Sequence, residues 1–202
     1  MTAARKLSTD KREAIIQAAI SEFHAHGFPA TSMDRIAEAA GVSKRTIYNH
    51  FGDKDGLFQA ISAEACRRIV EISELPYQPE VPLEEQLMRL AQAKLELLGS
   101  KDFLRLVRVT VAEKVRRPEV VEEAFAEISK GEFGATLWIR AAARDGRLRV
   151  DDSLAASLQF SALLKEFALW PQLFGTRPPL SASERTEVAR KAVRMFLDHY
   201  QV

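Results

Sequence analysis

Cationic, hydroxyl, amide and aromatic side chains cluster between residues 43 and 54, and these chemical groups are the ones that proteins use to bind DNA. Lysine and arginine donate to phosphate and base oxygens, while tyrosine, serine and backbone groups add further phosphate contacts. The sequence has no comparable set for catalysis: it lacks His-Glu-x-x-His, a phosphate-binding glycine loop and Gly-x-Ser-x-Gly, and it has one cysteine. The pattern therefore favours nucleic-acid binding and predicts neither an enzyme nor a metal or cofactor site.

Two short helices around a glycine turn would position this cluster. Thr31 or Ser32 can cap the first helix, and Thr31 with Asp34 three residues later is a variant of the capping box. Gly41 is suited to end that helix in the left-handed conformation, and Ser43 is placed to cap the second helix. The spacing predicts a helix-turn-helix motif.

The second helix has one apolar and one polar face. Ile47 and Phe51 are four residues apart and share the side that faces the core. A generic helical hairpin with solvated charges is the alternative, which the agreement of caps, turn glycine and apolar spacing disfavours. The side chains left for the outer face and flanks, where a major groove could be met, are Lys44, Arg45, Thr46, Tyr48, Asn49 and His50.

This helix and the turn after it resemble the DNA-binding signature of TetR-type one-component transcriptional regulators. The resemblance is carried by Ser-Lys-Arg-Thr-Ile-Tyr-Asn-His-Phe-Gly-Asp-Lys-Asp-Gly-Leu-Phe at residues 43–58, and at motif level it extends over residues 10–60. It implies that Tyr48, His50 and Lys54 hold phosphates. It also implies that the first positions of the helix touch bases, with Thr46 on a base or the backbone. The predicted DNA-binding set is Thr31, Ser32, Lys44, Arg45, Thr46, Tyr48, Asn49, His50 and Lys54.

A further helix is predicted before the motif, because a helix-turn-helix needs a third helix to form a core. Ser8 or Thr9 can cap this helix, and apolar residues recur along one side of it. Arg5 and Lys6 would precede it on an arm that could enter a minor groove of bound DNA and is otherwise solvated. The three helices together predict a DNA-binding domain over residues 1–55.

Residues 56–202 are expected to form a helical domain for effector binding and dimerisation, so that the predicted fold class is all-α. A helix near residues 53–74 would connect the two domains, and prolines at residues 76–82 end it. No alternating strand pattern of convincing length occurs. The remaining helices are predicted near residues 83–99, 101–116, 118–130, 133–145, 152–174 and 182–201.

The second domain carries more apolar surface than a small core needs, which predicts a partner subunit or a pocket. By the family resemblance, the last two helices pack against a second copy as a four-helix interface. A twofold protein also suits a near-palindromic site on double-stranded DNA. The candidates for this homodimer interface are Leu154, Leu158, Ala162, Val188, Ala192, Met195 and Phe196.

A small-molecule effector is a further partner that the resemblance implies, because in similar proteins a ligand among these helices lowers operator affinity. Residues 103–121 also resemble the C-terminal domains of the AefR-like subgroup. Lys165 and Glu166 would pair across the dimer or bind a polar ligand group. The candidate pocket residues, which could equally be plain core, are Phe103, Val107, Thr110, Trp138 and Phe167.

Composition fits a cytoplasmic regulator without a membrane segment. The net charge is +1, and residues 1–60 hold eight Lys and Arg against seven Asp and Glu, also +1, so DNA binding must depend on local arrangement. No apolar run is long enough to span a membrane, and the N-terminus lacks a secretory stretch. Cys66 has no intramolecular partner and is expected to be a buried hydrophobe rather than a redox switch.

The function expected from these features is a dimeric repressor that blocks transcription at its operator and is released by a small apolar or amphipathic molecule. Activation of transcription is left open by the sequence. A ligand-binding protein that has lost DNA binding is a second alternative, and it fits poorly with the intact Tyr48, His50 and Lys54 set.

Overall fold

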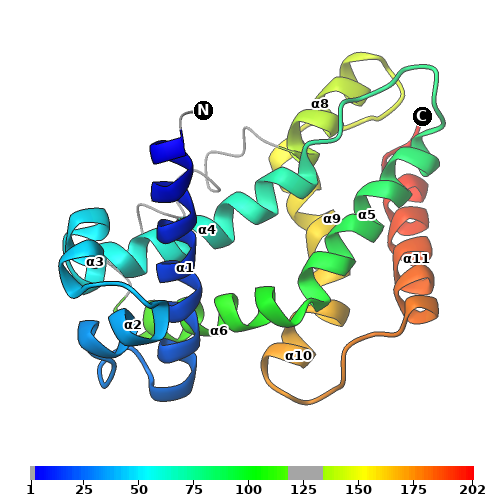
Figure 1. Ribbon diagram of the computed structural model, residues 1–202. Coiled ribbons are helices and arrows are strands. Elements are labelled where there is room, and N and C mark those ends of the chain that lie inside the picture. The colour runs from blue at the N-terminus through cyan, green and yellow to red at the C-terminus, as the bar shows by residue number, and fades with distance from the viewer. Residues whose placement is uncertain (1–2, 118–133) are drawn as a thin grey trace. The chain divides into compact units, whose positions relative to one another are not determined.

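Helices form the regular secondary structure in a computed structural model of this protein, which describes residues 3–117 and 134–202 (Figure 1). No strand occurs in these two ranges, where Leu148 and Gln201 form an isolated bridge. The predicted all-α class is confirmed, while the helix predicted at 118–130 lies outside the described residues. The helices are α1 (Ala3–His26), α2 (Met33–Ala40), α3 (Lys44–Phe51), α4 (Lys54–Ser73), α5 (Leu83–Gly99), α6 (Lys101–Arg116), α8 (Ala135–Arg144), α9 (Ser153–Ala168), α10 (Trp170–Leu173) and α11 (Ala182–Tyr200).

The first helix begins earlier than predicted. It starts at Ala3, so Ser8 and Thr9 lie inside the helix and not at its N-cap position, and Arg5 and Lys6 belong to the helix instead of a separate arm. Residues 3–13 hold alanine, leucine, lysine, arginine and glutamate, which are strong helix formers, and they contain no glycine or proline. Residues that favour a cap are tolerated within such a segment.

The single helix predicted at 152–174 is divided at Leu169 into α9 and α10. Pro171 has no backbone N–H, so the carbonyl of Phe167, four residues earlier, cannot receive the usual helical bond. The Gln172 side-chain amide donates to that carbonyl instead, at 3.3 Å, and to the Pro178 carbonyl at 3.1 Å. The Phe167 carbonyl, which has no helical partner at the break, is therefore still hydrogen-bonded.

The chain divides into two compact units. The N-terminal unit comprises residues 1–65 with residues 105–126, of which 105–117 are described, and the C-terminal unit comprises residues 66–104 with 127–202. These units do not follow the boundary predicted between residues 55 and 56, because Leu57, Phe58 and Ile61 at the start of α4 are fully buried. Both α4 and α6 contain a unit boundary within the helix.

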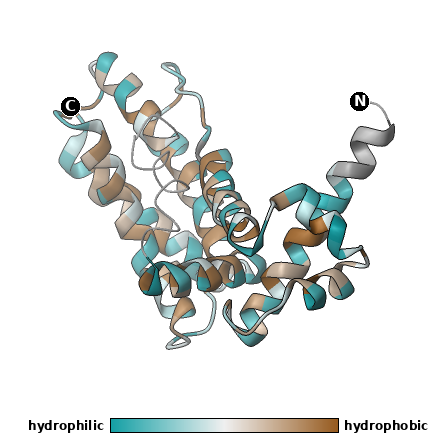
Figure 2. Cartoon of the chain, turned by 90° about the vertical axis from the view of Figure 1, so that its left-hand side faces the viewer, coloured by the Kyte–Doolittle hydropathy of each residue, from teal (hydrophilic) through white to brown (hydrophobic). Residues whose placement is uncertain are grey.

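Each unit has its own apolar core, and Figure 2 shows helices that carry hydrophobic residues beside hydrophilic ones. In the N-terminal unit the rings of Phe23 and Phe58 both contact Phe28, with centroids 5.0 and 5.3 Å away. In the C-terminal unit α5 packs against α9 and α11, and the rings of Phe160 and Phe196 meet edge to face at 5.2 Å. In the described ranges, none of the helices combines the length and the hydropathy that a membrane-spanning segment requires.

Candidate nucleic-acid interface

The turn between α2 and α3 is built from local signals that the sequence contains. Gly41 has φ 64°, in the left-handed region, and ends α2 with its N–H on the carbonyl of Glu38 at 3.1 Å. The Ser43 side chain accepts the Thr46 backbone N–H at 3.1 Å and so caps α3. Both predictions are confirmed. The start of α3 is thereby held at one orientation relative to α2, in the arrangement of a helix-turn-helix.

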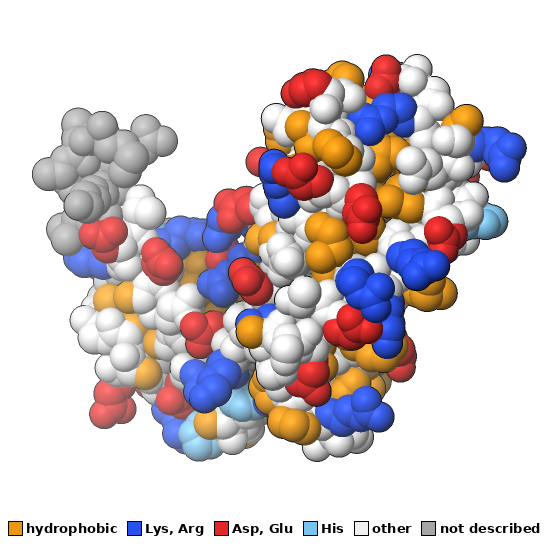
Figure 3. Space-filling model, turned by 90° about the vertical axis from the view of Figure 1, so that its right-hand side faces the viewer, with side chains coloured by type: hydrophobic (Ala, Val, Ile, Leu, Met, Phe, Trp, Pro, Cys, Tyr) orange, Lys and Arg blue, Asp and Glu red, His pale blue; other side chains and the backbone are white. Residues whose placement is uncertain are grey.

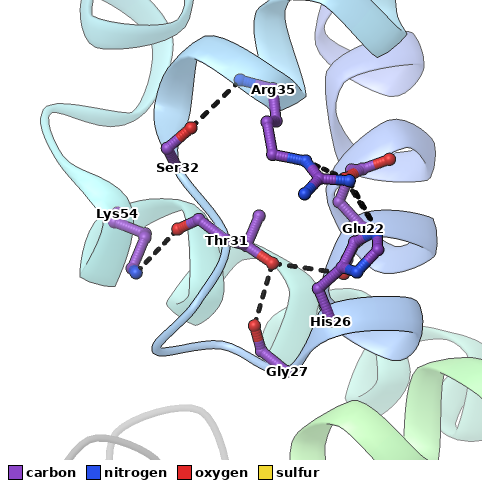
Figure 4. Close-up of polar contacts among 7 residues, drawn as sticks. All are labelled: Glu22, His26, Gly27, Thr31, Ser32, Arg35 and Lys54. Atoms are coloured by element: carbon purple, nitrogen blue, oxygen red, sulfur yellow. Dashed lines mark hydrogen bonds and ion pairs between the residues drawn. The ribbon is translucent and has the colours of Figure 1, made fainter.

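The cap of α2 is Ser32, and the predicted capping box of Thr31 with Asp34 is wrong. The Ser32 hydroxyl accepts the Arg35 backbone N–H at 3.3 Å, which places an arginine where the box would need an acid or amide. Thr31 is only 1% exposed, and its hydroxyl donates inward to the Gly27 carbonyl at 2.8 Å, with the Glu22 carbonyl at 3.2 Å (Figure 4). Carbonyls at the end of α1 need such partners, so Thr31 is not available to contact DNA.

Lys54 has a structural environment that differs from the predicted phosphate contact. Its ammonium donates to the carbonyls of Phe28 at 2.7 Å, Thr31 at 2.9 Å and Pro29 at 3.3 Å. It also lies 4.5 Å from the centre of the Phe28 ring, within cation–π range. Because an ammonium has three N–H groups, all of them have partners inside the N-terminal unit. Lys54 therefore holds the α1–α2 connection to the start of α4 (Figure 4).

The polar face of α3 is open to solvent. Ile47 is fully buried and anchors the helix, and Phe51 beside it is half-buried. Arg45 and Asn49 are exposed, and the Tyr48 side chain keeps 43% of its surface exposed. The Tyr48 hydroxyl is a suitable donor to a DNA phosphate.

Thr46 and His50 flank this face and are half-buried. The Thr46 hydroxyl shares a hydrogen bond with the Ser43 hydroxyl at 2.8 Å, so part of its bonding capacity is used within the turn. The His50 ring lies 6.0 Å from the Phe51 ring in a tilted arrangement. These two residues are thus placed at the border of the exposed face and not at its centre.

Lys44 is exposed but has an acidic partner. Its ammonium lies 2.8 Å from the Asp34 carboxylate on α2, and this hydrogen bond raises the pKa of Lys44 above its usual value. Lys44 is therefore a full cation at neutral pH, yet part of its field is neutralised by Asp34. To reach a base, the lysine must exchange Asp34 for the DNA.

Charged and aromatic contacts orient α2 on α1. The Arg35 guanidinium donates to the Glu22 carboxylate at 3.1 Å and approaches the His26 ring nitrogen at 2.6 Å (Figure 4). Arg35, whose side chain remains half exposed, thus has two guanidinium nitrogens bonded within the unit. Among the described residues no group of three or more His, Cys, Asp and Glu could hold a metal ion.

A contact between residues distant in sequence connects the end of α6 to the same unit. The Arg117 guanidinium donates to Asp55 at 2.9 Å and to Glu113 at 2.5 Å, and lies 4.7 Å from the centre of the Phe28 ring. Both hydrogen bonds raise the pKa of Arg117, and the bond to Asp55 has the larger effect. Phe28 thus receives two cations, Lys54 and Arg117. No local pattern in the sequence predicts this cluster, because Arg117 and Asp55 are 62 positions apart.

The candidate pocket residues do not all belong to one unit. Phe103 and Trp138 are buried in the C-terminal unit, where the Trp138 indole N–H donates to the Gln86 side-chain oxygen at 3.0 Å. Phe167, in the same unit, is 48% exposed. Val107 and Thr110 belong to the N-terminal unit, and the buried Thr110 hydroxyl donates to the Leu106 carbonyl at 2.9 Å. Their assignment to a single pocket stays a prediction.

The candidate interface residues fall into two groups by exposure. Leu158 is 55% and Met195 60% exposed, and Ala162 is exposed as well. Leu154 and Val188 are half-buried. Ala192 and Phe196 are 3% exposed and belong to the core of their own unit, so their prediction as interface residues is corrected. Figure 3, in which the right-hand side of Figure 1 faces the viewer, shows hydrophobic side chains at the surface between charged ones.

Comparison with family models places both parts of the chain among bacterial regulators. Residues 15–61 match the model described as bacterial regulatory proteins, tetR family, and residues 85–202 match the C-terminal domain of the AefR-like transcriptional repressors. The first match covers the helix-turn-helix geometry described above. The second covers α5 onward, in agreement with the predicted subgroup.

Similar proteins and structures are regulators as well, not enzymes. A crystal structure of a TetR family transcriptional regulator from Pseudomonas syringae pv. tomato str. DC3000 is 43% identical, with TM-score 0.84 over 95% of this chain and 97% of that one. The flavonoid-responsive regulator FrrA is 28% identical, with TM-score 0.72 over 95% of this chain and 97% of its own. The HTH-type transcriptional regulator YhgD of Bacillus subtilis (strain 168) is 29% identical over 141 residues, 69% of this chain and 71% of YhgD.

Proposed function

This chain belongs to the TetR family of DNA-binding transcriptional regulators, and on that premise we propose that it is a homodimeric repressor, released from its operator by a small apolar or amphipathic molecule. The proposal rests on the polar face of α3, which is exposed to solvent. The helix is capped at its start, and Ile47 on its other face anchors it in the core. A repressor of this kind acts on chromosomal DNA in the cytoplasm. The AefR-like C-terminal domain supports repression over activation.

The proposed DNA contacts follow from exposure on α3 and its flanks. Lys44 and Arg45, at the start of the helix, would reach base edges in the major groove. Tyr48 and His50, toward its end, would donate to phosphates, with Asn49 between them. The partly engaged Thr46 and the exposed cap Ser32 complete the set at its border. Thr31 and Lys54 are left out because their donors are bound within the unit.

Dimerisation is proposed through the exposed apolar side chains of α9 and α11. Leu158, Ala162 and Met195 would lie in the centre of the contact, with Leu154 and Val188 at its edge. Two copies are needed because one recognition helix covers only half of an operator, and a twofold axis repeats the same contacts on the second half-site.

Replacement of both Leu158 and Met195 by glutamate should convert the dimer to a monomer. Each change removes an apolar contact worth about 1.5–3 kcal/mol and buries a charge in its place, so we expect at least about a hundredfold weaker self-association. Sedimentation equilibrium measures this directly. Glutamate at Val115, which is 79% exposed on α6, serves as the control and should leave the dimer intact. An unchanged dimer in the double variant would argue for an interface elsewhere.

The proposed effector is a small molecule that binds in the C-terminal unit. One relative of similar fold, FrrA, is described as a flavonoid-responsive regulator, which supports a ligand of moderate size with an apolar body. The C-terminal unit offers an apolar environment for such a ligand. Because α4 and α6 both continue from one unit into the other, chain connectivity provides two helical links to the DNA-binding residues.

Sequencing of the genomic DNA that the full-length protein retains tests the whole proposal. We expect enrichment of an inverted repeat whose half-sites lie about one helical turn apart, and loss of that enrichment when an effector is added. Genes beside the enriched sites should rise in expression when the protein is deleted. Retention of fragments without a shared sequence, at low and high salt alike, would contradict the assignment of a specific repressor.

A further inference from the structure

A buried lysine that forms no ion pair with any described carboxylate lies in the C-terminal unit. Lys94 on α5 is 8% exposed, and its ammonium donates to the Ser161 hydroxyl on α9 at 2.5 Å. Ser161 is itself 9% exposed. Over residues 3–117 and 134–202, no carboxylate forms an ion pair with Lys94. A charged group in this position is expensive to keep unless an anion compensates for it.

The surroundings increase the need for an anion. Lys165, one helical turn after Ser161 on α9, is close enough to repel Lys94. Two effects lower the pKa of Lys94 to about 8: its burial, which is the larger, and the positive charge of Lys165. Lys165 is half-buried and Glu166 is exposed, and the pairing expected for them across the dimer stays a prediction.

The Ser161 hydroxyl has a proton with which it could help to bind an anion. Because its oxygen accepts from Lys94, its own proton remains free to be donated, and no acceptor for it occurs among the described residues. The ammonium and the hydroxyl can therefore both donate to one oxyanion group. Most of the other buried residues on the two helices are apolar, Gln86 and Ser157 being the polar exceptions, so the rest of such a ligand would mainly contact hydrocarbon; the apolar ones include Leu90, Ala91, Leu95, Phe160, Leu164 and Ala168.

We propose that Lys94 and Ser161 bind the carboxylate of a small apolar acid, whose hydrocarbon body lies between α5 and α9. The inference rests on the proposed function and names the chemical class of its effector, a monocarboxylate. One negative charge on the ligand suffices to compensate Lys94. The half-buried Lys165 would also attract that charge. A neutral ligand of the same shape would leave the ammonium uncompensated.

Calorimetric titration of the full-length dimer with straight-chain carboxylates, from hexanoate to tetradecanoate, and with their methyl esters tests this site. For the best chain length we expect the acid to bind at least about tenfold more tightly than its ester. In Lys94→Met this preference should fall to about one, and in Ser161→Ala it should be reduced. Lys191→Met, an exposed lysine on α11, is the matched control and should keep the wild-type preference.

The stability of the ligand-free variants gives a second readout that does not depend on the choice of acid. If Lys94 is uncompensated, Lys94→Met should melt at a higher temperature than the wild type. The folded-state pKa of about 8 lies below the usual 10.5, so the penalty is complete below pH 8 and disappears as the pH rises toward 10.5. The difference in melting temperature should therefore shrink over that interval, and saturating carboxylate should abolish it.

Failure of this inference and failure of the proposed function give different results. Equal binding of acid and ester, binding of neither across the series, or a lower melting temperature for Lys94→Met would each overturn the carboxylate site. The last of these would mean that Lys94 already has a stabilising partner. Tight binding of the acid through Lys94 with no loss of operator occupancy would keep the site and overturn ligand-controlled release.

Discussion

Replacement of Lys54 by methionine should lower the free energy of unfolding of the N-terminal unit by about 2–4 kcal/mol. The ammonium donates to the carbonyls of Phe28, Pro29 and Thr31 and lies over the Phe28 ring, so its removal leaves acceptors of the α1–α2 connection without their donor. Hydrogen bonds to a charged group are worth more than neutral ones, and unpaired acceptors add a cost. Operator affinity should fall as a consequence of the lost order in this connection.

Hydrogen exchange of amides in α1, α2 and α3 of the full-length protein measures this effect, because it reports the opening free energy of one unit separately from the other. Lys44→Met is the matched control. Its ion pair with Asp34 is exposed, at 47% and 69% for the two side chains, so its loss should change stability by no more than about 0.5 kcal/mol. Wild-type protection in Lys54→Met, together with weaker DNA binding, would restore Lys54 as a phosphate contact.

Replacement of Arg45 by alanine should remove most of the preference of the dimer for its operator over unrelated DNA. Arg45 is exposed at the start of α3, with no hydrogen bond among the described contacts to restrain it. A bidentate contact of arginine with guanine is worth about 1–3 kcal/mol of discrimination, and a twofold dimer makes it twice, for about 2–6 kcal/mol in total. Affinity for unrelated DNA should fall much less.

Tyr48→Phe provides the comparison for Arg45→Ala. The ring is kept, and only the hydroxyl that would donate to a phosphate is lost, so we expect operator and unrelated DNA to lose affinity by the same factor. Fluorescence anisotropy with both DNAs, over a series of salt concentrations, separates the two behaviours. If Arg45→Ala weakened binding to both DNAs equally, Arg45 would be a phosphate contact and the base contacts would lie elsewhere on the helix.

Local signals determined the parts of this protein that sequence analysis predicted well. The turn at Gly41, the cap at Ser43 and the burial of Ile47 depend on residues within one or two helical turns, where the chain itself sets the geometry. The same reasoning predicted α5, α6 and α11 to within a residue or two of their ends. The break at Leu169 was also encoded locally, in Pro171, but the strong apolar pattern around it concealed the signal.

The tertiary structure alone decided which partners the charged and polar side chains have. Lys54 meets carbonyls 23–26 residues away, Arg117 meets Asp55 at a separation of 62 residues, and Lys94 meets Ser161 at 67. Such side chains are long and carry several donors, so their type and spacing fit DNA, an acid or a carbonyl equally well. Their roles follow from what folding brings within hydrogen-bonding distance, and that is a property of the packed helices and not of the local sequence.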